Sequence, residues 1–272
     1  MTVHKFSAMT MGATLLLLIA GGLVTSTGSG LAVPDWPLSY GTLFPPMVGG
    51  IRFEHTHRLI AALVALMIVA LTVWLWRVES RRWVRWIGAS ALLAVIIQAV
   101  LGGLTVLWGL PLPVSVAHAC LGQIVLCLLA CVMLATSPKW EALSASRVSH
   151  GSSLRLLSIV VTLVVFAQLI FGAVLRHGGG WALMPHMAGA LLVLVLVALT
   201  FRRVRRARDL PVSPRRVVMV LAGMVAVQLL LGPAALFHLD QAWLTMAHQV
   251  VGAMVLAHAC LLWMMMACVT RG

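Results

Sequence analysis

Two pairs of histidines recur about 130 residues apart in this 272-residue chain, each in a matching local sequence. The four residues are His57 and His118 in the first half and His186 and His248 in the second. Gln98 precedes His118 by the same distance as Gln228 precedes His248, and a glycine follows each of these glutamines by four residues. The pattern indicates an internal duplication in which each copy carries two imidazoles.

Two imidazoles that face each other across a helix bundle are the axial ligands that a six-coordinate haem iron requires. A bare metal ion would lack ligands there, because neither pair brings the Cys, Asp or Glu that closed zinc and non-haem iron sites use. One histidine in an apolar helix is more often hydrogen-bonded to a neighbouring helix. Two matched pairs instead favour binding of a metal or haem.

A carboxylate accompanies only the first of these histidines. Glu54 lies three residues before His57 and on the same helical face, whereas Leu183 has the equivalent place before His186. Glu54 could pair with Arg58 or cap the helix, or it could move protons at a reacting site. The asymmetry favours a reacting site in the first half and an electron-relay site in the second. His55 points to nearly the opposite side of the helix from His57.

The composition predicts an all-α integral membrane protein, since 62% of the residues are hydrophobic and only 9% are charged. Apolar runs long enough to span a membrane lie at Met9–Val24, Leu59–Trp76, Ile87–Leu107, Val116–Thr136, Leu156–Leu175, Met184–Phe201, Val217–Leu236 and Trp243–Val269. We expect the first run to be a retained helix and not a signal peptide, because the duplication implies equal halves.

The eight helices are therefore expected to form two tandem four-helix bundles, over residues 1–138 and 139–272, related by a pseudo-two-fold axis along the membrane normal. The formal charge of +13 does not indicate nucleic-acid binding, because the basic residues are sorted by membrane side. Only Arg52, Arg58 and Arg176 fall on the side opposite the others. Both termini are thus predicted to be cytoplasmic, and the four histidines to lie toward the outer face.

Outside the paired histidines, two classes of residue are predicted to have ordinary roles. His177 and His238 lie in outer loops and are expected to be solvated. The five cysteines all lie within the predicted helices, where a buried thiol behaves as a small hydrophobic group. The sequence offers no disulfide for an outer loop.

The segment Glu54-His55-Thr56-His57-Arg58, with the loop at residues 28–41 and its Pro34-Asp35-Trp36-Pro37, resembles the haem A synthases of the cytochrome oxidase assembly pathway. The similarity extends over nearly the whole length. It implies an eight-helix protein of the cell membrane that oxidises the C8 methyl group of haem O to the formyl group of haem A.

By position, the resemblance implies that His57 and His118 bind the substrate haem O, that His186 and His248 bind haem b, and that Glu54 is the required carboxylate. It also suggests haem O synthase and cytochrome oxidase assembly factors as partners, beside membrane lipid; a homo-oligomer is left open.

Many relatives carry two loop cysteines where this chain has Val33 and Ser39, so the loop must be ordered without a disulfide. Trp36 could stiffen that loop or serve as an interfacial anchor. Two other functions fit the ligand pattern: a bis-histidine di-haem electron carrier, and a haem transporter or chaperone.

Overall fold

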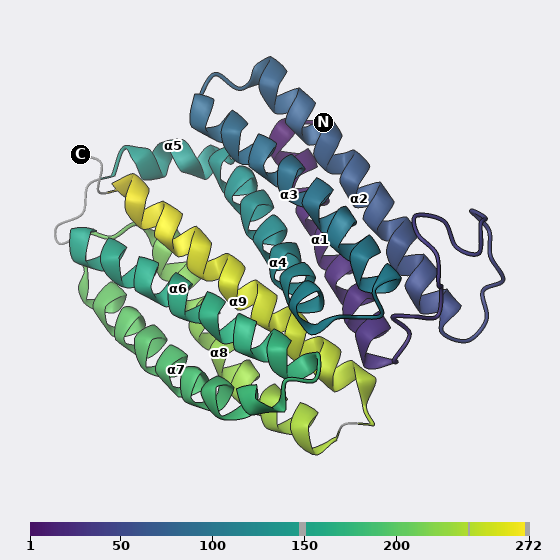
Figure 1. Cartoon of the computed structure of the whole chain (residues 1–272). Coiled ribbons are helices and arrows are strands. Elements are labelled where there is room, and N and C mark those ends of the chain that lie inside the picture. The colour runs from purple at the N-terminus through teal and green to yellow at the C-terminus, as the bar shows by residue number, and fades with distance from the viewer. Residues whose placement is uncertain (147–150, 239, 270–272) are drawn as a thin grey trace.

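The protein is all-helical over residues 1–146, 151–238 and 240–269, which are the residues that this computed structural model describes (Figure 1). Its elements are α1 (Val3–Ser26), α2 (Ile51–Val78), α3 (Arg82–Leu107), α4 (Leu112–Ala135), α5 (Pro138–Ser144), α6 (Gly151–Arg176), the 3₁₀ turn η1 (Gly180–Ala182), α7 (Leu183–Arg206), α8 (Val212–Phe237) and α9 (Ala242–Val269).

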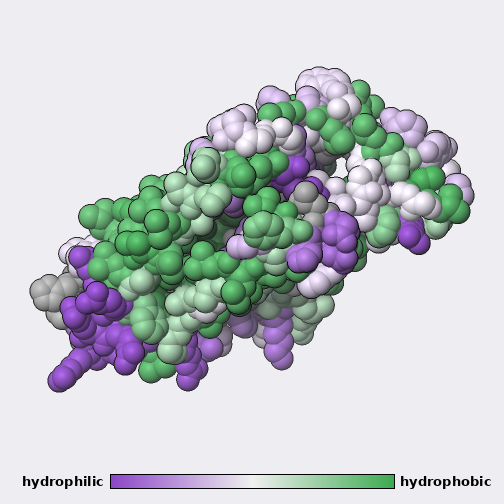
Figure 2. Space-filling model, turned by 90° about the horizontal axis from the view of Figure 1, so that it is seen from below, coloured by the Kyte–Doolittle hydropathy of each residue, from purple (hydrophilic) through white to green (hydrophobic). Residues whose placement is uncertain are grey.

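Eight of these helices are long and apolar enough to cross a membrane, which confirms the eight predicted spans. Large hydrophobic side chains are exposed along their outer surfaces, as lipid contact requires. Figure 2 views the molecule from below and shows a broad hydrophobic region, with a group of hydrophilic side chains at one end. The chain is therefore a multi-pass membrane protein.

The helices form two groups, each a ring of four neighbours. In the first group α1 contacts α2 and α4, and α3 contacts α2 and α4; in the second, α6 contacts α7 and α9, and α8 contacts α7 and α9. The groups meet through α1, α4, α6 and α9, with α4 and α9 in the middle (Figure 1). This arrangement agrees with tandem bundles, while the division at residue 138 stays a prediction.

Consecutive helices pair as four helical hairpins: α1–α2, α3–α4, α6–α7 and α8–α9. In three of them the first helix ends at a glycine with positive φ, namely 65° at Gly28, 69° at Gly109 and 103° at Gly178. A left-handed residue of this kind closes a helix and reverses the chain, and glycine adopts it without steric cost. We call the end of the molecule that holds these turns the histidine end.

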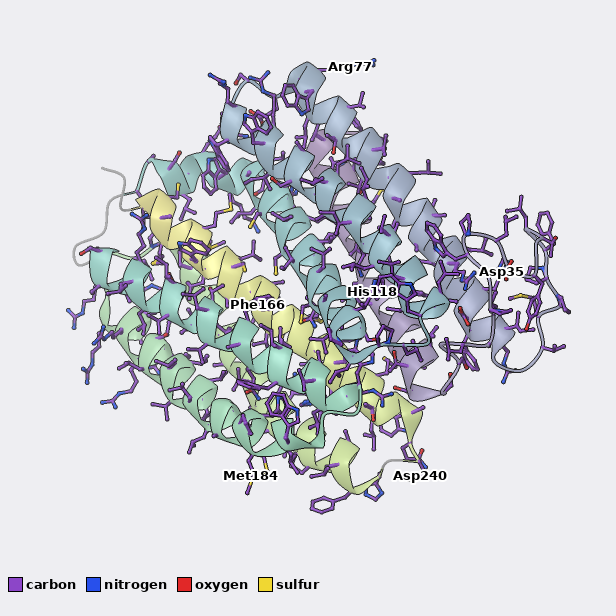
Figure 3. The ribbon with its side chains drawn as sticks, in the orientation of Figure 1. Asp35, Arg77, His118, Phe166, Met184 and Asp240 are labelled. Carbon is purple, nitrogen blue, oxygen red and sulfur yellow. The ribbon has the colours of Figure 1, made fainter. Side chains whose placement is uncertain are left out.

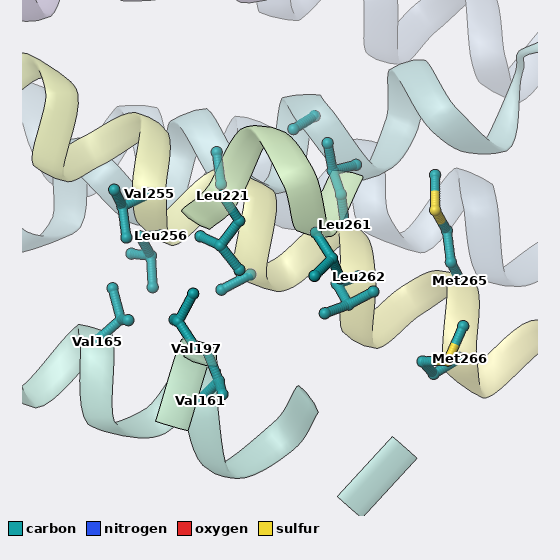
Figure 4. Close-up of a cluster of buried hydrophobic side chains, with 14 of the residues drawn as sticks. Val161, Val165, Val197, Leu221, Val255, Leu256, Leu261, Leu262, Met265 and Met266 are labelled. Atoms are coloured by element: carbon teal, nitrogen blue, oxygen red, sulfur yellow. The ribbon is translucent and has the colours of Figure 1, made fainter. Parts of the chain in front are cut away.

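Two clusters of buried hydrophobic side chains lie away from the histidine end. One cluster joins α4 to the second group, and Figure 4 shows its members Val161, Leu221 and Leu262 facing one another from α6, α8 and α9. The other cluster joins α2, α3 and α4, from Val64 to Leu75 along α2. Packing of these side chains holds each ring of helices together.

The core predicts a specific pattern of stability. Leu262 is 1% exposed, whereas Leu230, on the surface of α8, is 75% exposed. Leu262→Ala should leave a cavity and destabilise the folded chain by about 2 kcal/mol or more, and Leu230→Ala should change little. Thermal unfolding in detergent measures both; equal shifts for the two variants would contradict this packing.

Candidate functional site

Each of the four histidines packs its imidazole directly against a glycine of the preceding helix. The pairs are His57 on Gly21, His118 on Gly102, His186 on Gly172 and His248 on Gly232. A Cβ atom at the glycine would lie 3.0 Å from the imidazole Cε1 in the first three pairs and 3.4 Å in the fourth. In the first three pairs a Cβ would crowd the ring, whereas at Gly232 it would make an ordinary van der Waals contact. The glycine thus lets the ring lie close against the facing helix.

A buried valine follows each histidine by seven residues. These valines are Val64, Val125, Val193 and Val255. Residues seven apart lie on the same face of a helix, two turns distant, so each valine begins the packed core below its histidine. In Figure 3 His118 lies inside the first group toward the end that carries Asp35, while Arg77 is at the far end.

Three glutamines hold the backbone of three of the histidines. Gln98 Nε2 donates to the carbonyl of His118 at 2.9 Å, Gln168 Nε2 to that of His186 at 2.7 Å, and Gln228 Nε2 to that of His248 at 2.9 Å. Each glutamine lies four residues before the supporting glycine, and Leu17 has that place in the first hairpin. The site of His57 therefore differs from the other three in its support.

The imidazole of His186 is oriented for ligation through Nε2. Its Nδ1 lies 3.1 Å from the carbonyl oxygen of Gln168. Because a carbonyl can only accept, Nδ1 carries the hydrogen and Nε2 keeps its lone pair, which is the usual arrangement of a metal-binding histidine. In His57, His118 and His248, Nδ1 is buried and has no hydrogen-bond partner within the described residues.

The histidines of each half come together from two hairpins. The ring centroids of His186 and His248 are 6.1 Å apart, with the ring planes at 76°. Two imidazoles that bind one central ion through bonds of about 2.0–2.1 Å would have centroids separated by roughly 6 Å. His57 and His118 are close enough to interact electrostatically.

The donor set fits a metalloporphyrin better than a bare ion. No group of three or more His, Cys, Asp or Glu side chains that could hold an ion occurs among the described residues. Two imidazoles alone leave a bare transition-metal ion short of ligands, whereas an iron porphyrin brings four nitrogens and needs two more.

Glu54 lies one helical turn before His57 and forms an ion pair with Arg58. It is 3% exposed, Oε1 accepts from Arg58 Nη2 at 2.6 Å, and Oε2 accepts from the backbone N–H of Val33 at 2.9 Å. The arginine also donates to the carbonyl of Asp35 at 2.7 Å. The pairing of Glu54 with Arg58, one of the two roles considered from the sequence, is present, and it ties the 27–50 loop to α2.

The loop is ordered without a disulfide, and the side chain or backbone of both Val33 and Ser39 makes contacts that hold it. Val33 is fully buried and donates its N–H to Glu54, and the Ser39 hydroxyl lies 2.8 Å from Nδ1 of the buried His55. Trp36 packs on α3, where a Cβ at Gly103 would come within 2.7 Å of the indole. The loop thus spans from α2 to α3 beside the glycine that supports His118.

Sequence reasoning identified the four histidines and Glu54 but missed several residues that position them. Gly21, Gly172 and Gln168 were not recognised, nor were the four valines. A search for Gly–His pairs in consecutive helices, each His followed seven residues later by valine, would have found all four hairpins. His238 is exposed as expected. The expectation of a solvated His177 was wrong, since this side chain is half-buried beside Arg176, and burial lowers its pKa.

The Asp35 carboxylate is expected to stabilise the 27–50 loop at neutral pH. The backbone N–H groups of Gly41 and Tyr40 donate to Asp35 and lower its pKa from the ordinary 3.8. A depressed pKa stabilises the loop above the ordinary value, and this contribution is lost as the pH falls through the folded value. Asp35→Asn should speed amide hydrogen exchange at Tyr40 and Gly41 at neutral pH. Asp240→Asn is the control and should leave exchange at Tyr40 and Gly41 unchanged. Unchanged exchange in Asp35→Asn would show that the Asp35 carboxylate does not hold the turn.

Comparison with known proteins gives matches over much of this chain. Heme A synthase of Lysinibacillus sphaericus is 34% identical over 60% of this chain, and the match covers only 54% of that protein, so the chain spans about half of its length. Heme A synthases of Geobacillus kaustophilus and Listeria welshimeri are 26% and 25% identical over 89% and 94% of this chain and 84% and 93% of their own lengths.

The family of cytochrome oxidase assembly proteins designated COX15-CtaA matches residues 51–189, about half of the chain. That segment contains Glu54 and three of the four glycine-supported histidines. With its histidine hairpins and eight spans, the chain belongs to the COX15-CtaA family of cytochrome oxidase assembly proteins.

Proposed function

We propose that the protein is a haem A synthase, which oxidises the C8 methyl group of haem O to a formyl group. The observation that carries the proposal is the pairing of glycine-supported imidazoles in each half, in a chain of the COX15-CtaA family. His57 and His118 would hold the substrate haem O, and His186 and His248 a resident haem b. The iron porphyrins would supply the redox chemistry when bound.

Glu54 is the residue that we assign to proton movement at the first site. Conversion of a methyl to a formyl group breaks two C–H bonds and so requires proton transfer at the site, and a buried carboxylate one helical turn before His57 is in position to take part in it. The same carboxylate holds Arg58 and Val33, so it would couple the chemistry to the loop above the site. The other three hairpins have no equivalent acidic residue.

The charge distribution supports a cell-membrane location with both termini in the cytoplasm. Arginines concentrate at the ends of α2 and α7, opposite the histidine end. Positive residues are retained on the cytoplasmic side of bacterial membranes, so the histidine end would face outward. Haem O synthase and other assembly factors would meet the chain within this membrane.

The proposal is tested by co-expressing the chain with a haem O synthase and identifying the extracted haems by mass. Haem A should appear with the intact chain and disappear with His57→Ala or Glu54→Ala. An electron carrier or a haem transporter would leave haem O unchanged in every case, and that result would refute the enzyme assignment.

Glu54→Gln separates the two roles of this carboxylate. The amide keeps an acceptor for Val33 and preserves the shape of the side chain, but it cannot accept a proton at neutral pH. Haem A should therefore be lost, by about 100-fold or more, while haem still binds at the first site. Full activity of Glu54→Gln would mean that Glu54 only holds the loop.

The two sites should lose haem separately. His186→Ala, or Gly172→Val, whose new side chain would occupy the space of the His186 ring, should remove the haem b absorbance and leave the first site able to bind haem. Gly223→Val is the matched control, because Gly223 is exposed and nothing lies within 4 Å of a Cβ there. Loss of all haem from a single change at His186 would show that the halves do not bind independently.

A further inference from the structure

Arg176 lies at the histidine end, one helical turn beyond the glycine that supports His186. It is the last residue of α6 and follows Gly172 by four residues, so both lie on the same helical face. The side chain reaches the other half of the molecule, where Nη2 donates to the Ser26 hydroxyl of α1 at 3.0 Å. One turn before Ser26, Gly22 packs on Met246 and Gln249, beside His248. The guanidinium is thus placed at the outer edge of the second site.

This guanidinium lacks a carboxylate. Its Nε is buried and has no hydrogen-bond partner within the described residues. The ion pairs found in those residues are Arg58–Glu54 and Arg81–Glu79, so Arg176 is in neither. The adjacent His177 does not supply a negative charge, and burial together with Arg176 lowers its pKa. A half-buried guanidinium whose buried Nε–H has no acceptor is costly unless an anion accepts from it.

The position is specific to one of the four hairpins. Four residues after the supporting glycine, the other hairpins have Thr25, Val106 and Leu236. A cation is therefore present at only one of four equivalent places, and its place belongs to the pair His186 and His248. A general requirement of the fold would be expected in more than one copy.

We propose that Arg176 binds a carboxylate side chain of the tetrapyrrole held by His186 and His248. The inference rests on the proposed haem b site and assigns the residue that orients its macrocycle. Haem carries two carboxylates on one edge, and a guanidinium binds a carboxylate through paired N–H donors. The contact would set the rotation of the macrocycle about the axis between the imidazoles, with its carboxylate edge toward the histidine end and α1.

The test compares haem b with its dimethyl ester, which has the same ring but no carboxylate. The chain is prepared without haem in neutral detergent, with His118→Ala to remove a ligand of the first site, and titrated by absorbance. Haem should bind about tenfold or more tightly than the ester. Arg176→Gln should weaken haem binding by that factor and leave the ester unaffected. Arg52→Gln, an exposed arginine at the same end, should keep the full preference.

A second readout avoids the His118→Ala background. In the otherwise unaltered chain, Arg176→Gln should lower the reduction potential of the haem bound at the second site, because a positive charge near the iron favours the reduced state. Arg176→Lys should give a reduction potential between those of the parent and of Arg176→Gln, since lysine keeps the charge and loses the paired donors.

Three outcomes would overturn the inference while haem binding itself remains intact. These are equal binding of haem and its ester by the parent, equal weakening of both by Arg176→Gln, and an effect of Arg176→Gln that appears only with added anionic lipid, which would assign the site to a lipid headgroup. If the parent binds neither porphyrin, the proposed haem sites themselves are wrong.

Discussion

The contact between an imidazole and a bare stretch of helix backbone is the constraint on which the site depends. A histidine between two membrane helices must lie close to both, and glycine lets the facing helix approach within van der Waals distance of the ring. Two further residues support the same histidine. In three hairpins a glutamine one turn before the glycine donates to the histidine carbonyl, and in all four a valine two turns after the histidine begins the core. Each hairpin therefore presents one ring at one depth.

Four identical copies of this hairpin would pair into two equal sites, and the differences between the copies distinguish the two halves. The first hairpin replaces the supporting glutamine by Leu17, adds Glu54 before its histidine, and carries the long loop that His55, Arg58 and Gly103 hold in place. The third hairpin adds Arg176 at the edge of the second site. The same scaffold thus carries an acidic residue one turn before the histidine of the first hairpin and a basic residue one turn after the supporting glycine of the third.

Hydropathy and the repeat were enough to predict eight spans, their order and the paired histidines, because lipid imposes a helix length and duplication preserves spacing. The fourfold repetition of the single hairpin was not predicted. Gly21 and His57 are separated by a loop that the other hairpins lack, so their spacing does not match. Contacts across that loop, such as Ser39 with His55, depend on how the chain folds back, and no local pattern predicts them.

The two central helices have a consequence for how the halves act on each other. His118 is on α4 and His248 on α9, and α4 and α9 pack together, whereas His57 and His186 are on α2 and α7 at the periphery. One histidine of each pair therefore lies on one of the two packed central helices, and the other lies on a peripheral helix. A rotation of α4 and α9 together would shift His118 and His248 at once, while a movement of α2 or α7 would shift only its own histidine. The spacing of the two histidine pairs therefore depends on how α4 and α9 pack on each other and on α1 and α6.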